Sequence, residues 1–186
     1  MTDLIFDENG EIRILRPAEI TKLINAIPKD KNKVKFETLL YTGARFSEIK
    51  ELYNNPRWFK GNGLQIPNSK YLARKRQKTR NIRLNPQGER TINQYFRCEK
   101  GLPTLQTWDE NLQRWCEKAG LNSEGVSAKT TRKTWESWLI MFYPERILNI
   151  FQSQGHSQVT ALEFYVNLPF TKDDVTQMTS YVDGWI

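Results

Sequence analysis

A chain of 186 residues is long enough to bury a hydrophobic core and fits a single domain. Its 28 lysines and arginines outnumber 21 aspartates and glutamates, and the formal charge of +7 and pI near 9.4 favour a polyanionic partner. One histidine and two cysteines are too few to favour a zinc site. The sequence has no apolar run long enough to cross a membrane, and its N-terminus lacks the basic-then-apolar layout of a signal peptide. We therefore expect a cytoplasmic protein with reduced thiols and no membrane partner.

The first part of the chain is predicted to be an arm followed by helices. Residues 1–16 form the arm, which can close as a short hairpin because Asn9-Gly10 is typical of a turn. Helices follow over 17–27, which begins with a proline, and over about 34–41.

The second of these helices is expected to stop at Thr42-Gly43, and the chain restarts as a helix at Arg45 or Phe46. This break places Arg45 at a helix N-terminus, where unpaired backbone N–H groups and the helix dipole favour an anion.

Three short extended segments are predicted next, over 57–60, 64–67 and 81–84, with a tight turn at 61–63. The intervening residues 68–80 contain six cations and no acidic residue. A basic hairpin with an interleaved tyrosine is typical of a surface that holds a phosphate backbone, and the alternative is a solvated loop. The residues that we expect to contact nucleic acid are Arg74, Lys75, Arg76, Lys78 and Arg80.

The rest of the chain is predicted to be almost entirely helical, with Pro86 and Pro144 opening helices and Thr171 as an N-cap. The helices are expected over 86–98, from 107 or 109 to 120, from about 128 to 142, over 145–151, over 157–165 and from 171 onward. The predicted fold class is mainly α with a small antiparallel β-sheet (α+β).

The helix from about Ala128 carries Lys129 and Arg132 on one face, because residues three apart are neighbours on a helix surface. Two adjacent cations repel each other, so the pair favours a bound anion such as a phosphate, although a solvated basic turn is the alternative. Apolar residues continue the helix at helical spacing and are expected in the core: Trp135, Trp138, Leu139 and Phe142.

These segments together resemble the tyrosine recombinase (phage integrase) family. Residues 42–49, Thr-Gly-Ala-Arg-Phe-Ser-Glu-Ile, match its first box, T-G-x-R-x-S-E-[IL], and Gly155-His156 followed by Tyr165 matches its G-H-x(8)-Y box. Lys129 and Arg132 occupy the H-x-x-R box with lysine in place of histidine, which resembles the integrases of archaeal viruses and plasmids.

The resemblance implies a metal- and ATP-independent reaction in which Tyr165 attacks a DNA phosphodiester and forms a 3′-phosphotyrosine. Arg45 and Arg132 would hold the non-bridging oxygens of that phosphate. His156 and Lys129 are the candidate proton acceptors, and a lysine that stays protonated shifts this role toward His156.

The resemblance also implies a lysine on the basic hairpin that protonates the leaving 5′-oxygen. Lys70 is the first choice because it follows the strand predicted over 64–67, with Lys75 and Lys78 as alternatives. Tyr143 and Tyr181 compete with Tyr165 as nucleophile, but their spacing from the Gly-His pair does not match the family's.

The resemblance covers residues 17–170 and implies one catalytic domain over 1–186, without the family's N-terminal core-binding domain and with weak DNA binding. Residues 171–186 would dock on a neighbouring subunit or fold back on their own domain. We expect a site-specific recombinase or integrase that acts on duplex DNA as a dimer or tetramer, with no cofactor and no small-molecule substrate. The alternatives are a nicking-closing enzyme like the type IB topoisomerases and a catalytically inactive DNA-binding module.

Overall fold

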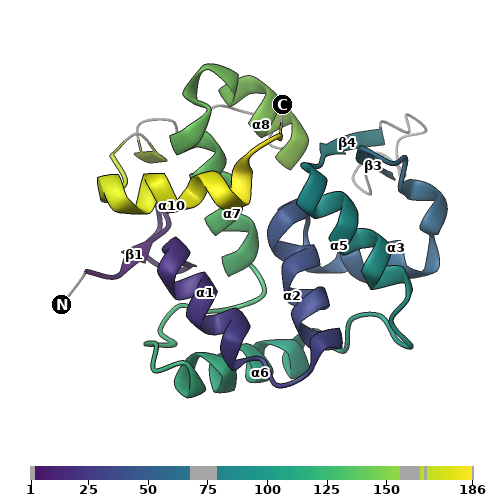
Figure 1. Cartoon of the computed structure of the whole chain (residues 1–186), viewed down its shortest axis with the longest axis horizontal. Helices are drawn as coiled ribbons and strands as arrows, with labels where there is room; N and C mark the ends of the chain where they lie inside the picture. Colours follow the sequence, from purple (N-terminus) through teal and green to yellow (C-terminus); the bar gives the residue numbers. More distant parts are fainter. Residues whose placement is uncertain (1–2, 68–78, 156–163, 166, 186) are drawn as a thin grey trace.

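The structure is a computed structural model that describes residues 3–67, 79–155, 164–165 and 167–185. It is mainly α-helical with small antiparallel sheets, as predicted (Figure 1). The helices of the first half are α1 (Pro17–Ala26), α2 (Asp30–Thr42), α3 (Phe46–Asn54) and α5 (Pro86–Phe96). Those of the second half are α6 (Leu105–Lys118), α7 (Thr130–Phe142), α8 (Ile147–Gln154) and α10 (Lys172–Val182).

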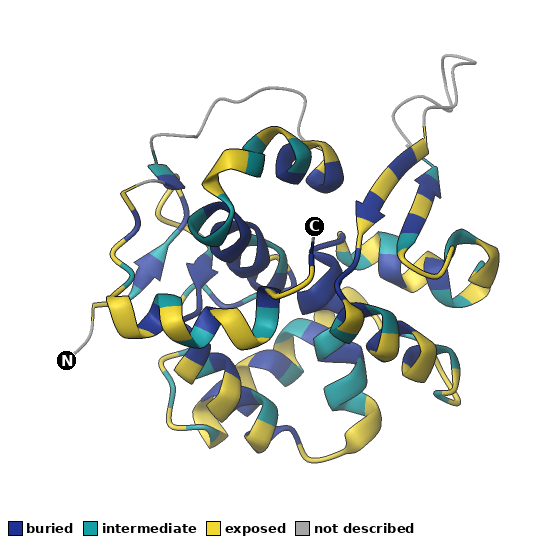
Figure 2. Ribbon diagram, turned by 45° about the horizontal axis from the view of Figure 1, so that its top comes forward, coloured by how far each residue is buried: buried dark blue, intermediate teal, exposed yellow. Residues whose placement is uncertain are grey.

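Two separate two-stranded sheets form in the described part of the chain. The N-terminal arm closes as the predicted hairpin, with β1 (Ile5–Phe6) antiparallel to β2 (Arg13–Ile14). The second sheet pairs β3 (Gly63–Pro67) with β4 (Thr79–Arg83), so that Ile66 lies opposite Arg80. Figure 2 shows this second hairpin projecting beside the helices, and the basic segment 68–78 that joins its strands lies outside the described residues.

Helix α7 lies at the centre of the core. Trp135, Trp138 and Leu139 are fully buried, in agreement with the apolar spacing of the sequence, whereas Phe142 at the end of the helix is only partly buried. The helix packs against α2, α8, α10 and strand β2, so almost its whole surface is covered (Figure 2). A side chain at the start of α7 is therefore held by several elements that are distant in sequence.

The C-terminal segment folds back on its own chain. Thr171 caps α10, as predicted, because its hydroxyl accepts a hydrogen bond from the Asp174 amide at 3.1 Å. Helix α10 packs against α7 and α1, Asp174 pairs with Arg16, and Trp185 is buried.

Several of the predicted boundaries need correction, among them the start of α2, which lies at Asp30 and not at about residue 34. The segment 57–60 is not extended, because Pro56 opens a short 3₁₀ turn, η1 (Pro56–Trp58), and only Phe59 bridges to Leu64. Helix α6 begins before the predicted start because Thr104 caps it, accepting from the Thr107 amide at 3.2 Å.

The helix predicted over 145–151 is also different. Pro144 opens a second 3₁₀ turn, η2 (Pro144–Arg146), and the α-helical part, α8, continues to Gln154. The helix predicted from 157 lies largely outside the described residues.

Among the described residues, no helix combines the length and apolar character needed to cross a membrane.

Candidate active site

The break between α2 and α3 is built by Thr42 and Gly43. Gly43 ends α2 with φ +54°, a left-handed conformation that glycine adopts without strain. The Thr42 hydroxyl is buried and accepts a hydrogen bond from the Ala44 amide at 3.1 Å. A Cβ atom at Gly43 would lie 2.6 Å from the buried side chain of Gln154 and 2.7 Å from Trp135, so a larger residue does not fit here.

Arg45 follows as the N-cap of α3, as the sequence predicts. Its backbone amide donates to the Glu48 carboxylate at 2.8 Å, and its guanidinium Nη1 lies 3.0 Å from the same carboxylate. The Arg45 side chain is half exposed, whereas that of Glu48 is 16% exposed. The helix start therefore holds the arginine while leaving part of its guanidinium open to a ligand.

Arg132 lies in the first turn of α7 and reaches across to two other elements. Its Nη1 donates to the carbonyl of Gly43 at 2.8 Å, and its Nη2 donates to the carbonyl of Gln154 at the end of α8. Burial lowers the pKa of Arg132 to about 10, while the neighbouring Glu136 carboxylate opposes this shift. The guanidinium therefore remains a cation at neutral pH.

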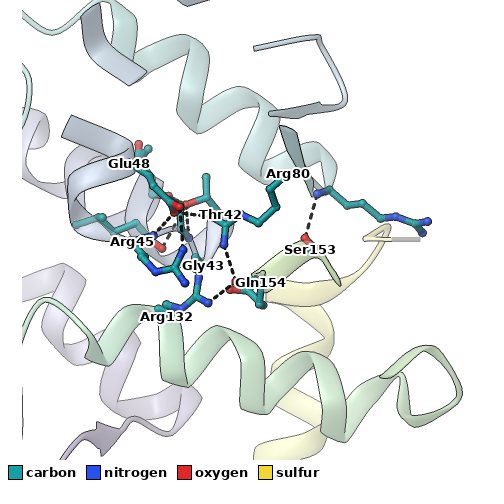
Figure 3. Close-up of polar contacts among 12 residues, drawn as sticks. Thr42, Gly43, Arg45, Glu48, Arg80, Arg132, Ser153 and Gln154 are labelled. Carbon is teal, nitrogen blue, oxygen red and sulfur yellow. Dashed lines mark hydrogen bonds and ion pairs between the residues drawn. The ribbon is translucent and has the colours of Figure 1, made fainter. Parts of the chain in front are cut away.

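Arg80 on β4 completes the cluster. The sequence predicts that it contacts nucleic acid, whereas in the structure its side chain is 7% exposed and paired with Glu48. Its Nη1 also donates to the Gln154 carbonyl at 2.5 Å. Figure 3 shows Arg45, Arg80 and Arg132 meeting around Glu48 and this carbonyl.

Tyr165 is buried and does not face solvent. Its exposed fraction is 2%, and its hydroxyl donates to the Glu136 carboxylate at 3.0 Å. Burial and the Glu136 charge raise the pKa of Tyr165 well above its usual value. Glu136 lies one helical turn after Arg132 on α7, so the phenol is near the arginine cluster but is held as a neutral hydrogen-bond donor.

The acidic tip of the N-terminal hairpin lies beside the same region. Lys133 Nζ is 2.8 Å from the Glu8 carboxylate and 6.0 Å from the centre of the Tyr165 ring. The arm therefore contributes to the surroundings of Tyr165, which the sequence did not indicate.

The other predicted site residues divide into two groups. Lys129 is exposed at the N-cap of α7, three residues before Arg132. The remaining predicted residues lie outside the described part of the chain: Lys70, Arg74, Lys75, Arg76, Lys78 and His156.

The two competing tyrosines have other partners. The Tyr143 hydroxyl donates to the Val182 carbonyl at 3.1 Å. Tyr143 follows the C-terminal end of α7, whereas Arg132 lies near its N-terminal end. The Tyr181 hydroxyl lies 2.7 Å from that of Thr21, and its ring packs on Trp138.

Sequence reasoning missed the parts played by Glu48, Arg80, Glu136 and Gln154. For Arg80 the sequence held a signal. Residues two apart lie on the same face of a strand, so Arg80 shares the buried face of β4 with the apolar residue Ile82. For Gln154 no local pattern pointed to its backbone carbonyl.

No protein-family model and no curated protein matches the sequence. Solved structures do match. The Tn1549 transposon integrase in complex with circular intermediate DNA aligns with TM-score 0.65 and 15% identity, over 90% of this chain and 64% of that one. XerH site-specific recombinase bound to difH substrate aligns with TM-score 0.59 and 16% identity, over 87% of this chain and 52% of that one. A lambda integrase dimer bound to a COC′ core site aligns with TM-score 0.58 and 16% identity, over 82% of this chain and 58% of that one.

The chain thus has the fold of a tyrosine recombinase catalytic domain and spans between half and two thirds of the length of these proteins. At these identities the similarity establishes the fold and leaves the chemistry to the residues of the site.

Proposed function

We propose that this chain is the catalytic domain of a site-specific DNA recombinase or integrase that cleaves and rejoins duplex DNA through Tyr165. One observation carries the proposal. Arg45 and Arg132 come from separate helices and meet at the Gly43 break together with Arg80 (Figure 3). Three guanidinium groups against the carboxylates of Glu48 and Glu136 leave a net positive charge, which suits a backbone phosphate.

The chemistry follows from the residue types. The Tyr165 oxygen attacks the phosphorus, the bond to the 5′-oxygen breaks, and the non-bridging oxygens gain negative charge that Arg45 and Arg132 stabilise. His156 accepts the phenol proton, Lys129 adds positive charge, and a hairpin lysine gives a proton to the 5′-oxygen. The reverse transfer reseals the strand, so no ATP is consumed.

Lys70 remains the first choice for that hairpin lysine, with Lys75 and Lys78 as alternatives. The unit of function is residues 1–186 as one catalytic domain. Its partners are duplex DNA and further copies of the same chain, which the DNA complexes of XerH and the Tn1549 integrase and the lambda integrase dimer support.

A second candidate, a DNA-binding module without catalysis, is favoured by the buried state of Tyr165. Its hydroxyl is engaged by Glu136 and must leave that contact before it can attack a phosphate. A module of this kind would bind DNA through Arg45 and Arg132 without cutting it.

Relaxation of supercoiled plasmid separates these functions. We expect the wild-type protein to relax DNA without added metal or ATP, and Tyr165→Phe to relax none. Tyr143→Phe is the matched control, because it also removes one phenol hydroxyl but at the far end of α7. It should relax DNA at the wild-type rate.

Relaxation that survives in Tyr165→Phe would refute the assignment of the nucleophile. DNA binding without relaxation by the wild-type protein would favour the module. Relaxation without strand exchange between two copies of the mapped cleavage site would favour a nicking-closing enzyme.

A further inference from the structure

Arg80 lies inside the arginine cluster, yet the proposed chemistry assigns it no part. Its Nη2 is paired with the Glu48 carboxylate, and its Nη1 donates to the Gln154 carbonyl at 2.5 Å. Both acceptors also bind a second arginine: Glu48 binds Arg45 at 3.0 Å, and the Gln154 carbonyl binds Arg132. Arg80 is therefore the middle member of a continuous series of contacts that runs from Arg45 to Arg132.

The surroundings of Arg80 are built to hold it there. Its position on β4 points it away from solvent together with Ile82. Gly155 has φ +72°, and a Cβ atom at this position would lie 2.7 Å from both Cδ and Nη1 of Arg80. The glycine that ends α8 thus makes room for the guanidinium, and the carbonyl before it lies at the negative end of the helix dipole.

Arg80 is too well covered to be a contact for the phosphate backbone. Its side chain is 7% exposed, whereas that of Arg45 is 50% exposed. The planar guanidinium can donate to two acceptors in fixed directions, which a lysine ammonium does not reproduce. Arg80 therefore acts on the other two arginines and not on the ligand.

We propose that Arg80 is a positioning residue that fixes the separation and orientation of Arg45 and Arg132 by holding Glu48 and the Gln154 carbonyl together. The inference rests on the proposed function, in which Arg45 and Arg132 bind the phosphate that is cleaved. Like charges at close range repel, so without the shared acceptors the two guanidinium groups would separate. Displacement of such groups by about 1 Å is enough to slow catalysis about a hundredfold.

The test compares Arg80→Lys with Arg83→Lys. Both variants keep the positive charge and lie on β4, but Arg83 is exposed on the other face of the strand. Cleavage of a nicked suicide duplex is measured under single turnover with saturating protein, and DNA affinity is measured separately by fluorescence anisotropy. We expect the saturated rate to fall about 10- to 100-fold in Arg80→Lys with affinity within about threefold of the wild type. Arg83→Lys should match the wild type in both measurements.

A second readout does not depend on cleavage. In protein labelled with ¹⁵N-arginine, the guanidinium signals of Arg132 should shift or broaden in Arg80→Lys and stay unchanged in Arg83→Lys. If Arg80→Lys does not fold, Glu48→Gln removes the charge at one end of the bridge, and the same loss of rate with retained affinity is expected.

A wild-type rate in Arg80→Lys would overturn the proposal. So would a loss confined to affinity, which would make Arg80 a DNA contact. If the wild-type protein forms no covalent adduct, the proposed function fails, and an unchanged Arg132 signal in Arg80→Lys would then also refute the positioning role.

Discussion

At the scale of single residues, Tyr165 has surroundings opposite to those of an active nucleophile. Burial and Glu136 both favour the neutral phenol, so the pKa of Tyr165 lies above its usual value. In the proposed mechanism this arrangement would correspond to a state before attack. If Tyr165 is the nucleophile, as we propose, its hydroxyl has to leave the Glu136 carboxylate before it can reach a phosphate.

This environment predicts how stability depends on pH. Above about pH 10 an unfolded tyrosine ionises, whereas folded Tyr165 keeps its proton. The unfolded state then binds fewer protons than the folded state, so the stability from this group falls as pH rises, by about 1.4 kcal/mol per pH unit. Tyr165→Phe lacks the titrating group and should lose less stability over the same range.

Urea unfolding at pH 8, 10 and 11 measures this difference. The stability advantage of the wild type over Tyr165→Phe should be present at pH 8 and shrink above pH 10. A constant difference between the two proteins would mean that Tyr165 is accessible to solvent.

The residues of the site were predictable only in part. The sequence singles out Arg45, Arg132 and Tyr165, because they occupy the boxes by which it resembles the tyrosine recombinase family. Arg80 does not, because its role depends on Gln154, which lies 74 residues away. All the cations of the basic segment 68–80 look alike in the sequence. In the structure, however, Arg80 lies on strand β4 with its side chain on the buried face.

At the scale of elements, the site depends on two helix ends. Gly43 ends α2 beside the Gln154 side chain, and Gly155 ends α8 beside Arg80. Both residues have positive φ, a backbone conformation that favours glycine. At both positions a neighbouring side chain also lies too close to leave room for a Cβ atom. The two glycines bring α2, β4 and α8 close enough to share acceptors.

Gly155 and Gly120 form a matched pair for testing this point. Their φ values are +72° and +68°, but a Cβ atom at Gly120 would meet nothing within 4 Å. Gly120→Ala should cost about 1 kcal/mol of unfolding free energy from the backbone conformation alone. Gly155→Ala should cost about 1–3 kcal/mol more, because it also displaces Arg80.

Chemical denaturation of both variants provides the measurement. Equal costs for the two substitutions would show that the contact between Gly155 and Arg80 is loose. In that case the close approach would not constrain the site.

Most elements followed from local signals in the sequence. Pro17, Pro86 and Thr171 mark helix starts, and the Asn9-Gly10 turn marks the arm hairpin. The prediction of an extended segment at 57–60 is wrong because Pro56 sets a short 3₁₀ turn there. The meeting of α3, β4 and α8 could not be predicted, because it depends on tertiary packing.

At the scale of the whole molecule, the C-terminal segment closes the fold of its own chain. The sequence leaves open whether residues 171–186 dock on a neighbour or fold back, and in the structure α10 packs against α7 and α1 of its own chain. Arg16 holds this segment by pairing with Asp174 and by donating to the Pro169 carbonyl at 3.0 Å. Docking on another copy would require these contacts to be released.

Asp174→Asn tests how strongly the segment is held. Because both partners are largely buried, loss of the carboxylate leaves the Arg16 charge uncompensated, and we expect a loss of about 3 kcal/mol in unfolding free energy. Asp173→Asn, at the exposed adjacent position, should cost less than about 1 kcal/mol. Similar losses for both variants in urea unfolding would show that the buried pair does not anchor α10.

The central claim is that the arginine cluster presents a DNA phosphate to Tyr165. The most direct measurement is to trap the protein on a nicked suicide duplex, isolate the covalent adduct on a denaturing gel and map the modified peptide by mass spectrometry. We predict one adduct, at Tyr165 through a 3′-phosphate, that disappears in Arg132→Ala. An adduct at Tyr143 or Tyr181, or DNA bound without any adduct, would contradict the account.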